Sequence, residues 1–149
     1  MSMIDIMFNL GASDARKLRS EAGELTDTEI IDREMSIPDF NPKKDYSACP
    51  KGTPVKNHDQ VFKLLIPHNA SHYTGEPADE TMRSLWEIAH TTNPYKAKPW
   101  IAPYGVSGLW SKGECYKTED GTVKRCISEQ PTNFNAEEMP SYWEDVYDL

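Results

Sequence analysis

The amino-acid sequence predicts a mainly β protein, in which two small three-stranded β modules follow one another after a short helical N-terminal leader. Three observations support this prediction. A set of proline, glycine and tryptophan landmarks occurs twice along the 149 residues. Eleven prolines divide the chain into segments that are too short for long helices. An Asp-Gly dipeptide separates two short runs of strand-forming residues, a pattern typical of a hairpin.

The duplication is clearest in the spacing of its landmarks. Three positions of the first copy recur 61 residues later, as the pairs Pro38 and Pro99, Pro42 and Pro103, and Gly52 and Gly113. The closing tryptophans, Trp86 and Trp143, are 57 residues apart. A constant offset that shortens only near the end is typical of duplication followed by loss of loop residues. Units of roughly 50 residues have marginal cores, so we expect them to pack together or to assemble with other chains.

Residues 1–36 are expected to form the helical leader. Ser13 or Asp14 can cap a first helix, which Gly23 ends. The segment Thr26–Glu29 fits a capping box and predicts a second helix that runs to about Met35. The extreme N-terminus is apolar, and we expect it to dock on another protein or on a second copy of the chain. The residues assigned to this contact are Met3, Ile4, Ile6, Phe8 and Leu10.

Residues 37–90 are expected to form the first β module. Val61–Ile66 predicts a strand, and a turn precedes it near Asn57–Asp59. A long polar loop, Pro67–Glu80, follows this strand. The last segment, Thr81–His90, fits either a helical turn or a final strand, and both alternatives stay open.

A linker over residues 91–98 leads to the second module, residues 99–149. Its strongest signal is Asp120-Gly121, which predicts a hairpin turn. Three short strands are expected in this module, over residues 114–117, 122–127 and 142–146.

The hairpin turn decides how two of the three cysteines are placed. A two-residue loop at Asp120-Gly121 would put Cys115 opposite Cys126. A three-residue loop would shift the register by one and put the two side chains on opposite faces. Reduced cysteines in or beside the core are the simpler interpretation, and a disulfide between them is the alternative.

Charge and hydropathy exclude several classes of partner. The net charge is −8 and no cluster of lysine and arginine is long enough to follow a phosphate backbone, so we expect no nucleic-acid partner. No apolar run approaches the roughly 20 residues that span a bilayer, so we expect no membrane insertion. Met1–Ile6 lacks the basic start and apolar stretch of a secretory signal.

The sequence also lacks the patterns of common enzymes. It has no Ser-His-Asp order, phosphate-cradling glycine loop or dinucleotide fingerprint. Adjacent carboxylates such as Glu144 and Asp145 point to opposite faces of a strand and cannot share an acid-base site there. His68 and His72 have the spacing of a helical metal pair but no third ligand. We therefore expect no enzyme activity, no cofactor and no metal.

Several motifs of the second module carry a resemblance to a known family. They are Trp100-x-x-Pro103, then Trp110-Ser111-Lys112-Gly113-x-x-Tyr116, the glycine-bearing hairpin, and the final Pro140-Ser141-Tyr142-Trp143. This pattern resembles the chitin-type carbohydrate-binding modules of families five and twelve. Over residues 25–146 the arrangement is similar to tandem copies in structural proteins of tailed bacteriophages, where a helical leader precedes two modules.

The resemblance implies a non-enzymatic virion structural protein, made in the host cytoplasm, that serves as a decoration, fibre or tail-associated element. Its expected partners are other virion proteins, further copies of itself in a homo-oligomer and host-surface glycans. The alternative is a free-standing carbohydrate-binding module that targets a chitin-like or peptidoglycan-like polymer without assembling.

The sequence departs from the family pattern at two positions. An aromatic residue commonly lies three positions before the turn glycine. Trp110 has this position in the second copy, but Cys49 has it in the first, where Tyr46 is the nearby aromatic residue. The valine three positions after the glycine is kept as Val55 and becomes Tyr116 in the second copy.

Aromatic side chains are the candidates for sugar binding, because the C–H faces of a pyranose stack on aromatic rings. The candidates are Tyr73, Trp100, Tyr104 and Phe134, with Asn69, Asn133 and Asn135 beside them. The alternative is that Trp100 belongs to the core and the loop aromatics only hold their loops. Trp86 and Trp143, which close the two copies, are expected in the core.

Overall fold

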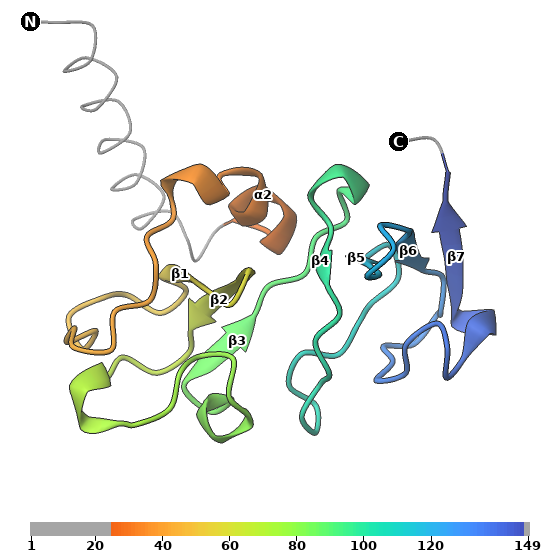
Figure 1. Ribbon diagram of the computed structural model, residues 1–149. Helices are drawn as coiled ribbons and strands as arrows, with labels where there is room; N and C mark the ends of the chain where they lie inside the picture. The colour runs from red at the N-terminus through yellow and green to blue at the C-terminus, as the bar shows by residue number, and fades with distance from the viewer. Residues whose placement is uncertain (1–24, 148–149) are drawn as a thin grey trace, which may run out of the picture.

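The computed structural model describes residues 25–147 and is mainly β, with two sheets and little helix (Figure 1). The first sheet contains β1 (Pro54–Asn57), β2 (Gln60–Leu64) and β3 (Trp86–Ile88), paired antiparallel in the order β1-β2-β3. The prediction of a mainly β protein is therefore confirmed. The segment Thr81–His90 contains both of its predicted alternatives, a 3-10 turn at Glu80–Met82 and then β3.

The second sheet has one strand more than the sequence predicted. Its order is β4 (Lys98–Pro99), β5 (Cys115–Lys117), β6 (Val123–Cys126) and β7 (Trp143–Val146). The last three strands correspond to the predicted ones and pair antiparallel. The additional strand, β4, is two residues long and pairs parallel to β5, with Pro99 opposite Lys117.

The predicted capping box is present at the start of helix α2 (Asp27–Asp32). The Thr26 hydroxyl accepts a hydrogen bond from the Glu29 amide, and the Thr26 amide donates to the Glu29 carboxylate, each over 3.2 Å. The α-helix ends before the predicted Met35, and a 3-10 turn at Glu34–Ser36 follows it. The first predicted helix and the apolar docking residues Met3, Ile4, Ile6, Phe8 and Leu10 lie outside the described residues.

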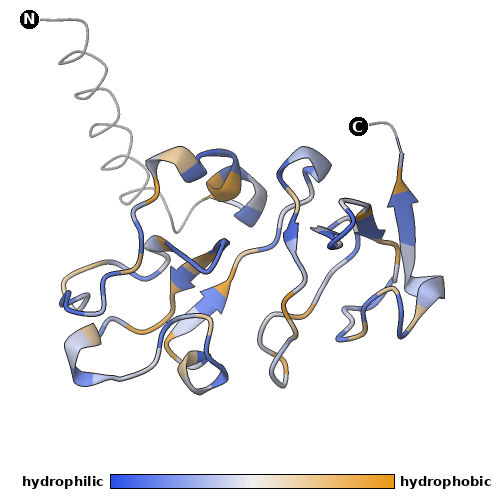
Figure 2. Cartoon of the chain, in the orientation of Figure 1, coloured by the Kyte–Doolittle hydropathy of each residue, from blue (hydrophilic) through white to orange (hydrophobic). Residues whose placement is uncertain are grey.

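Helix α2 covers part of the first sheet with two isoleucines. Ile30 and Ile31 are 0% exposed and pack in a cluster with Ile37, Val61 and Ala89. They form the hydrophobic part of an otherwise hydrophilic helix (Figure 2). The burial of these side chains, rather than the length of the helix, stabilises this segment.

The two hairpins have loops of different length. In the first, His58 and Asp59 both have positive φ, at 50° and 60°, as a two-residue type I′ loop requires. The second has a three-residue loop over residues 119–121, which places Cys115 opposite Arg125. Cys115 and Cys126 consequently lie in different clusters, and the three cysteines are free.

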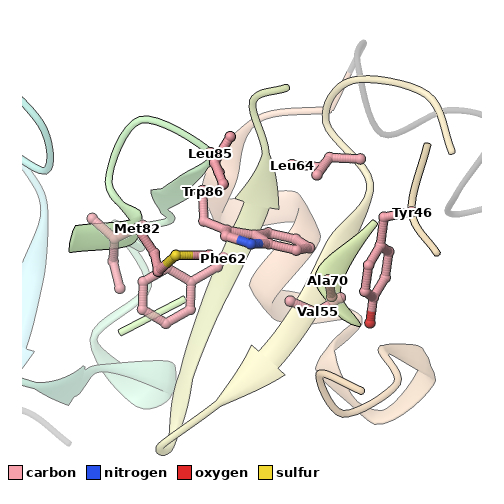
Figure 3. Packing of buried hydrophobic residues seen from close by; sticks show 9 residues of the cluster. Tyr46, Val55, Phe62, Leu64, Ala70, Met82, Leu85 and Trp86 are labelled. Carbon is pink, nitrogen blue, oxygen red and sulfur yellow. The ribbon is translucent and has the colours of Figure 1, made fainter. Parts of the chain in front are cut away.

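Each sheet has three aromatic rings that pack on one another in a similar way. In the first sheet these are Phe40, Tyr46 and Trp86, with Phe40 stacked on Tyr46 and both rings edge-on to Trp86. Trp86 is 0% exposed and lies in the middle of the cluster, among Tyr46, Phe62 and Leu64 (Figure 3).

The second sheet repeats this arrangement with Trp100, Trp110 and Trp143. Trp100 stacks on Trp110 at an interplanar angle of 14°, where Phe40 stacks on Tyr46 at 11°. Trp100 is edge-on to Trp143 at 80°, where Phe40 is edge-on to Trp86 at 81°. Tyr46 thus fills in the first sheet the place that Trp110 fills in the second, although it lies three residues further from its glycine.

Backbone hydrogen bonds around the two turn glycines are also alike. The Gly52 amide donates to the Leu64 carbonyl over 2.7 Å, and the Gly113 amide donates to the Cys126 carbonyl over 2.8 Å. The two glycines have φ of 95° and 94°, which side-chain-bearing residues rarely adopt. After each central strand, one amide donates to the carbonyl before the closing tryptophan, from Leu65 to Leu85 and from Ile127 to Tyr142.

Several contacts join the two sheets directly. β4, the edge strand of the second sheet, lies on the side toward the first sheet (Figure 1). A β-bridge pairs Thr91 with Cys115, and the Gln60 amide group donates to the Pro99 carbonyl over 2.8 Å. The His90 ring stacks on Trp110 with centroids 3.5 Å apart. Ile101 packs against the aromatic clusters of both sheets. The contacts are apolar as well as polar, so the sheets share one continuous packed structure.

Candidate functional site

A groove with a volume of about 820 Å³ lies beside the β5–β6 hairpin. Its walls come from the end of β4, from β5 and β6, from the hairpin loop and from the loop at residues 135–137. The side chains that line it include Trp100, Tyr116, Lys117, Glu119, Asp120, Lys124, Asn135 and Glu137.

Trp100 forms the aromatic part of the groove and is held in place by other rings. One face is stacked on Trp110, with centroids 5.1 Å apart. Tyr116 and Trp143 contact it edge-on at 5.0 and 6.0 Å. The preceding residue, Pro99, is fixed by its pairing in β4. Trp100 is thus half-buried and preorganised, and the surface left uncovered lines the groove.

Two polar side chains of the groove have one hydrogen-bonding group engaged and another left for a ligand. The Tyr116 hydroxyl oxygen accepts from the Ala136 amide over 3.0 Å, so its own proton remains available to donate. The Asn135 side-chain oxygen accepts from the amides of Glu137 and Glu138, at 3.0 and 2.9 Å. Its NH₂ group has no partner within the described chain, and it can donate to a ligand.

The charged groups of the groove include both signs. Lys124 is paired with Asp145, whereas the ion pairs of residues 25–147 do not include Lys117, Glu119 or Glu137. Hydrogen bonds from Thr118 and Thr122 lower the pKa of Asp120 to about 2, so that this carboxylate stays ionised. Because a cation and several carboxylates lie around one aromatic ring, the groove suits a neutral ligand that is rich in hydroxyl groups.

The structure does not bring the four predicted sugar-binding residues together. Trp100 lines the groove. It also packs in the aromatic core, which was the alternative to sugar binding for this residue. Tyr73 contacts His68 edge-on at 5.2 Å in the first half of the chain. Phe134 accepts the Trp143 indole N–H at its backbone carbonyl over 2.9 Å. Tyr104 lies in a turn that its backbone closes with Ser107. No ring contact joins any two of the four.

Sequence reasoning missed three residues of this region. Tyr116 was named as part of the family motif and as a departure from it, but not as a binding residue, and Lys117 was not considered. The signal for both was the period of two along β5, which places one side chain inward and the next outward. His90 had no sequence signal, because its contact with Trp110 depends on how the two sheets pack.

Neither a metal centre nor a reactive thiol is indicated in the part of the chain that the structure describes. No group of three or more histidine, cysteine, aspartate or glutamate side chains gathers in residues 25–147 in a way that could hold a metal ion. Burial raises the pKa of Cys115 to about 11, which keeps it a thiol at neutral pH.

No helix within these residues has the length and apolar character needed to cross a membrane. A comparison of the chain with models of known protein families and with curated proteins found no match.

Proposed function

We propose that this chain is a non-enzymatic glycan-binding protein of a tailed-bacteriophage virion. In this proposal, a helical leader precedes two carbohydrate-binding-module-like units, residues 37–90 and 99–149, and the second unit binds a glycan in the Trp100 groove. The observation that carries the sugar-binding part is the position of Trp100. A fixed aromatic surface borders a groove whose free groups, at Tyr116, Lys117 and Asn135, donate hydrogen bonds.

The tandem arrangement is supported by the likeness of the two sheets. In each sheet, three aromatic rings pack at similar interplanar angles, and a turn glycine donates a corresponding hydrogen bond to a central strand. The glycan-binding roles of the units need not be equal, since Val55 replaces Tyr116 and Phe40 replaces Trp100 in the first. Those two changes remove a hydroxyl donor and a larger aromatic surface from the corresponding place.

The virion role is supported by the sequence resemblance, which covers residues 25–146 and so includes the last part of the leader before the two units. A free-standing carbohydrate-binding module is the alternative, and the N-terminal 24 residues discriminate between the two. They should be needed for assembly with other copies or other virion proteins in the first case. They should be dispensable for every activity in the second.

The test of the groove compares two aromatic substitutions. A glycan array with chitin-like and peptidoglycan-like oligomers identifies a ligand, and titration calorimetry then measures its affinity for the wild type, Trp100→Phe and Tyr73→Ala. We expect Trp100→Phe to weaken binding several-fold and Tyr73→Ala to leave it unchanged. Lys117→Ala, which alters an exposed side chain at the groove, should weaken binding without changing the melting temperature.

Two results would count against the groove. An array on which the wild type binds no glycan contradicts the sugar-binding role itself. Loss of affinity in Tyr73→Ala, with none in Trp100→Phe, moves the site to the loop aromatics of the first half.

A further inference from the structure

A second pocket, with a volume of about 370 Å³, lies where the segment at residues 80–84 of the first half meets the turn at residues 104–107 of the second. We propose that this pocket binds the carboxylate of an acidic sugar residue, such as a uronic acid, through Arg83. The site is separate from the Trp100 groove, and the two share no lining residue.

Arg83 is a buried cation without a carboxylate partner. Its side chain is 6% exposed, and no described carboxylate lies within the 4.0 Å of an ion pair. One guanidinium nitrogen, Nη2, donates to the Ala102 carbonyl over 3.3 Å. The other two nitrogens, Nε and Nη1, are buried and have no acceptor. Burial of a charge with two free donors is costly, which indicates that an acceptor from outside the chain completes the site.

The turn on the other side of the pocket supplies a second unsatisfied group. The hydroxyl of Ser107 is buried without a hydrogen-bond partner and lines the same pocket as Arg83. Reciprocal backbone hydrogen bonds of 3.0 Å between Tyr104 and Ser107 hold this turn. Two side chains with unsatisfied groups, from distant segments of the chain, therefore line the same pocket.

The chemistry of the pocket favours a carboxylate over a phosphate. The end of a guanidinium presents Nη1 and Nη2 as a fork that matches two carboxylate oxygens, and in Arg83 one N–H of Nη2 is already donated to Ala102. Glu80 also lines the pocket, and the chain carries a net charge of −8. Both repel a dianion such as phosphate more strongly than a carboxylate with a single charge.

The rim of the pocket favours a sugar as the carrier of that carboxylate. Tyr104 and Val106 are 55% and 88% exposed there and offer apolar contact to the C–H face of a ring. Ser84, an exposed residue, adds a hydroxyl group. The volume is near the lower end of ligand pockets, about 300 to 1,000 Å³, and suits a single sugar ring. The choice of a sugar rests on the proposed function, whereas the carboxylate contact rests on Arg83 alone.

The experiment titrates the full chain with an oligogalacturonate and, separately, with the matched neutral oligosaccharide, acetate and inorganic phosphate. We expect the oligogalacturonate to bind at least tenfold more tightly than the other three. Arg83→Gln should weaken this binding about tenfold or more, because it removes a charge-assisted contact. Trp100→Phe should leave it unchanged, so failure of the groove and failure of this pocket give different results.

Arg83→Gln also removes the contact with Ala102, so Tyr104→Ala and Ser107→Ala serve as milder variants. Their melting temperatures should stay near that of the wild type, and each should weaken oligogalacturonate binding several-fold. Equal affinity for the charged and neutral oligosaccharides overturns the proposal. So does binding of acetate or phosphate as tight as that of the oligogalacturonate, or unchanged binding in the folded variants Tyr104→Ala and Ser107→Ala.

Discussion

His90 shows how a single buried residue makes the junction between the sheets sensitive to pH. It stacks on Trp110, and its Nε2 donates to the Gly108 carbonyl over 3.0 Å, which fits a neutral ring. Burial lowers the pKa of His90 to about 4, since the charged form loses its hydration in this place. The nearby charges of Asp27, Lys63 and Arg83 partly oppose one another and do not reverse this direction.

We predict that His90 makes the protein less stable in acid. Between pH 6.5 and about 4 the unfolded chain takes up a proton at this residue and the folded chain does not. The contribution of the neutral ring is therefore fully present above pH 6.5 and is lost as the pH falls to about 4, by about 3 kcal/mol. Urea unfolding at several pH values should show the free energy of unfolding of the wild type falling relative to that of His90→Phe. A constant difference between the two proteins across this range would contradict the prediction.

Glu114 acts in the opposite direction at the same junction. Burial raises the pKa of this carboxyl to about 7, although the Ser111 amide donates to it. Between pH 4.5 and about 7 the folded chain holds a proton here that the unfolded chain has lost. We predict that the wild type loses stability relative to Glu114→Gln as the pH rises through this range. The same unfolding series measures it, with Glu119→Gln as an exposed control, and a wild-type curve parallel to that of Glu114→Gln would refute it.

Among the elements, α2 shows a local sequence signal and a tertiary contact acting together. A six-residue helix is unstable alone, so the capping box selects where it begins and the burial of Ile30 and Ile31 keeps it formed. We predict that Thr26→Ala lowers the free energy of unfolding by about 1 kcal/mol. Thr74→Ala, at an exposed threonine, should change it by less than about 0.5 kcal/mol. Chemical denaturation compares the two variants, and an equal effect of both would show that the cap contributes nothing.

Elements with strong local signals were predictable from the sequence. The Asp120-Gly121 turn, the strand near Val61 and the capping box at Thr26 each depend on neighbouring residues, and each is present. The length of the second hairpin loop was not predictable, because either length fits the same dipeptide. The structure has the three-residue loop, and this one position decides that Cys115 and Cys126 face different clusters.

Elements that depend on distant partners were missed. β4 has two residues and exists through its parallel pairing with β5, so no local pattern reveals it. The role of Tyr46 was also hidden, because spacing from the glycine pointed to Cys49. The structure shows that the Tyr46 ring makes contacts like those of Trp110, although the two residues lie at different distances from their turn glycines. For the candidate site, sequence reasoning found Trp100 and Asn135 but not Lys117, which only the pairing of β4 with β5 brings next to Trp100.

In the whole molecule, the position of α2 determines how many N-terminal residues can be removed without loss of buried contacts. Removal of residues 1–36 would take away Ile30 and Ile31, which are buried against the first sheet. Removal of residues 1–24 leaves these contacts intact. We predict that the 25–149 chain folds and binds the same glycan as the full chain but no longer self-associates. Sedimentation velocity measures this, and an unchanged oligomer in the truncated chain would contradict the assembly role of the leader.

In the proposed function, the second half of the chain holds a glycan against Trp100. Chemical-shift mapping of the ¹⁵N-labelled protein with the ligand identified on the array tests this most directly. We predict shifts of the Trp100 indole and of amides around Tyr116–Asp120 and Asn135–Glu137, while the Trp86 indole stays unchanged. Shifts confined to the loop around Tyr73, or no localised shifts at saturating ligand, would contradict it.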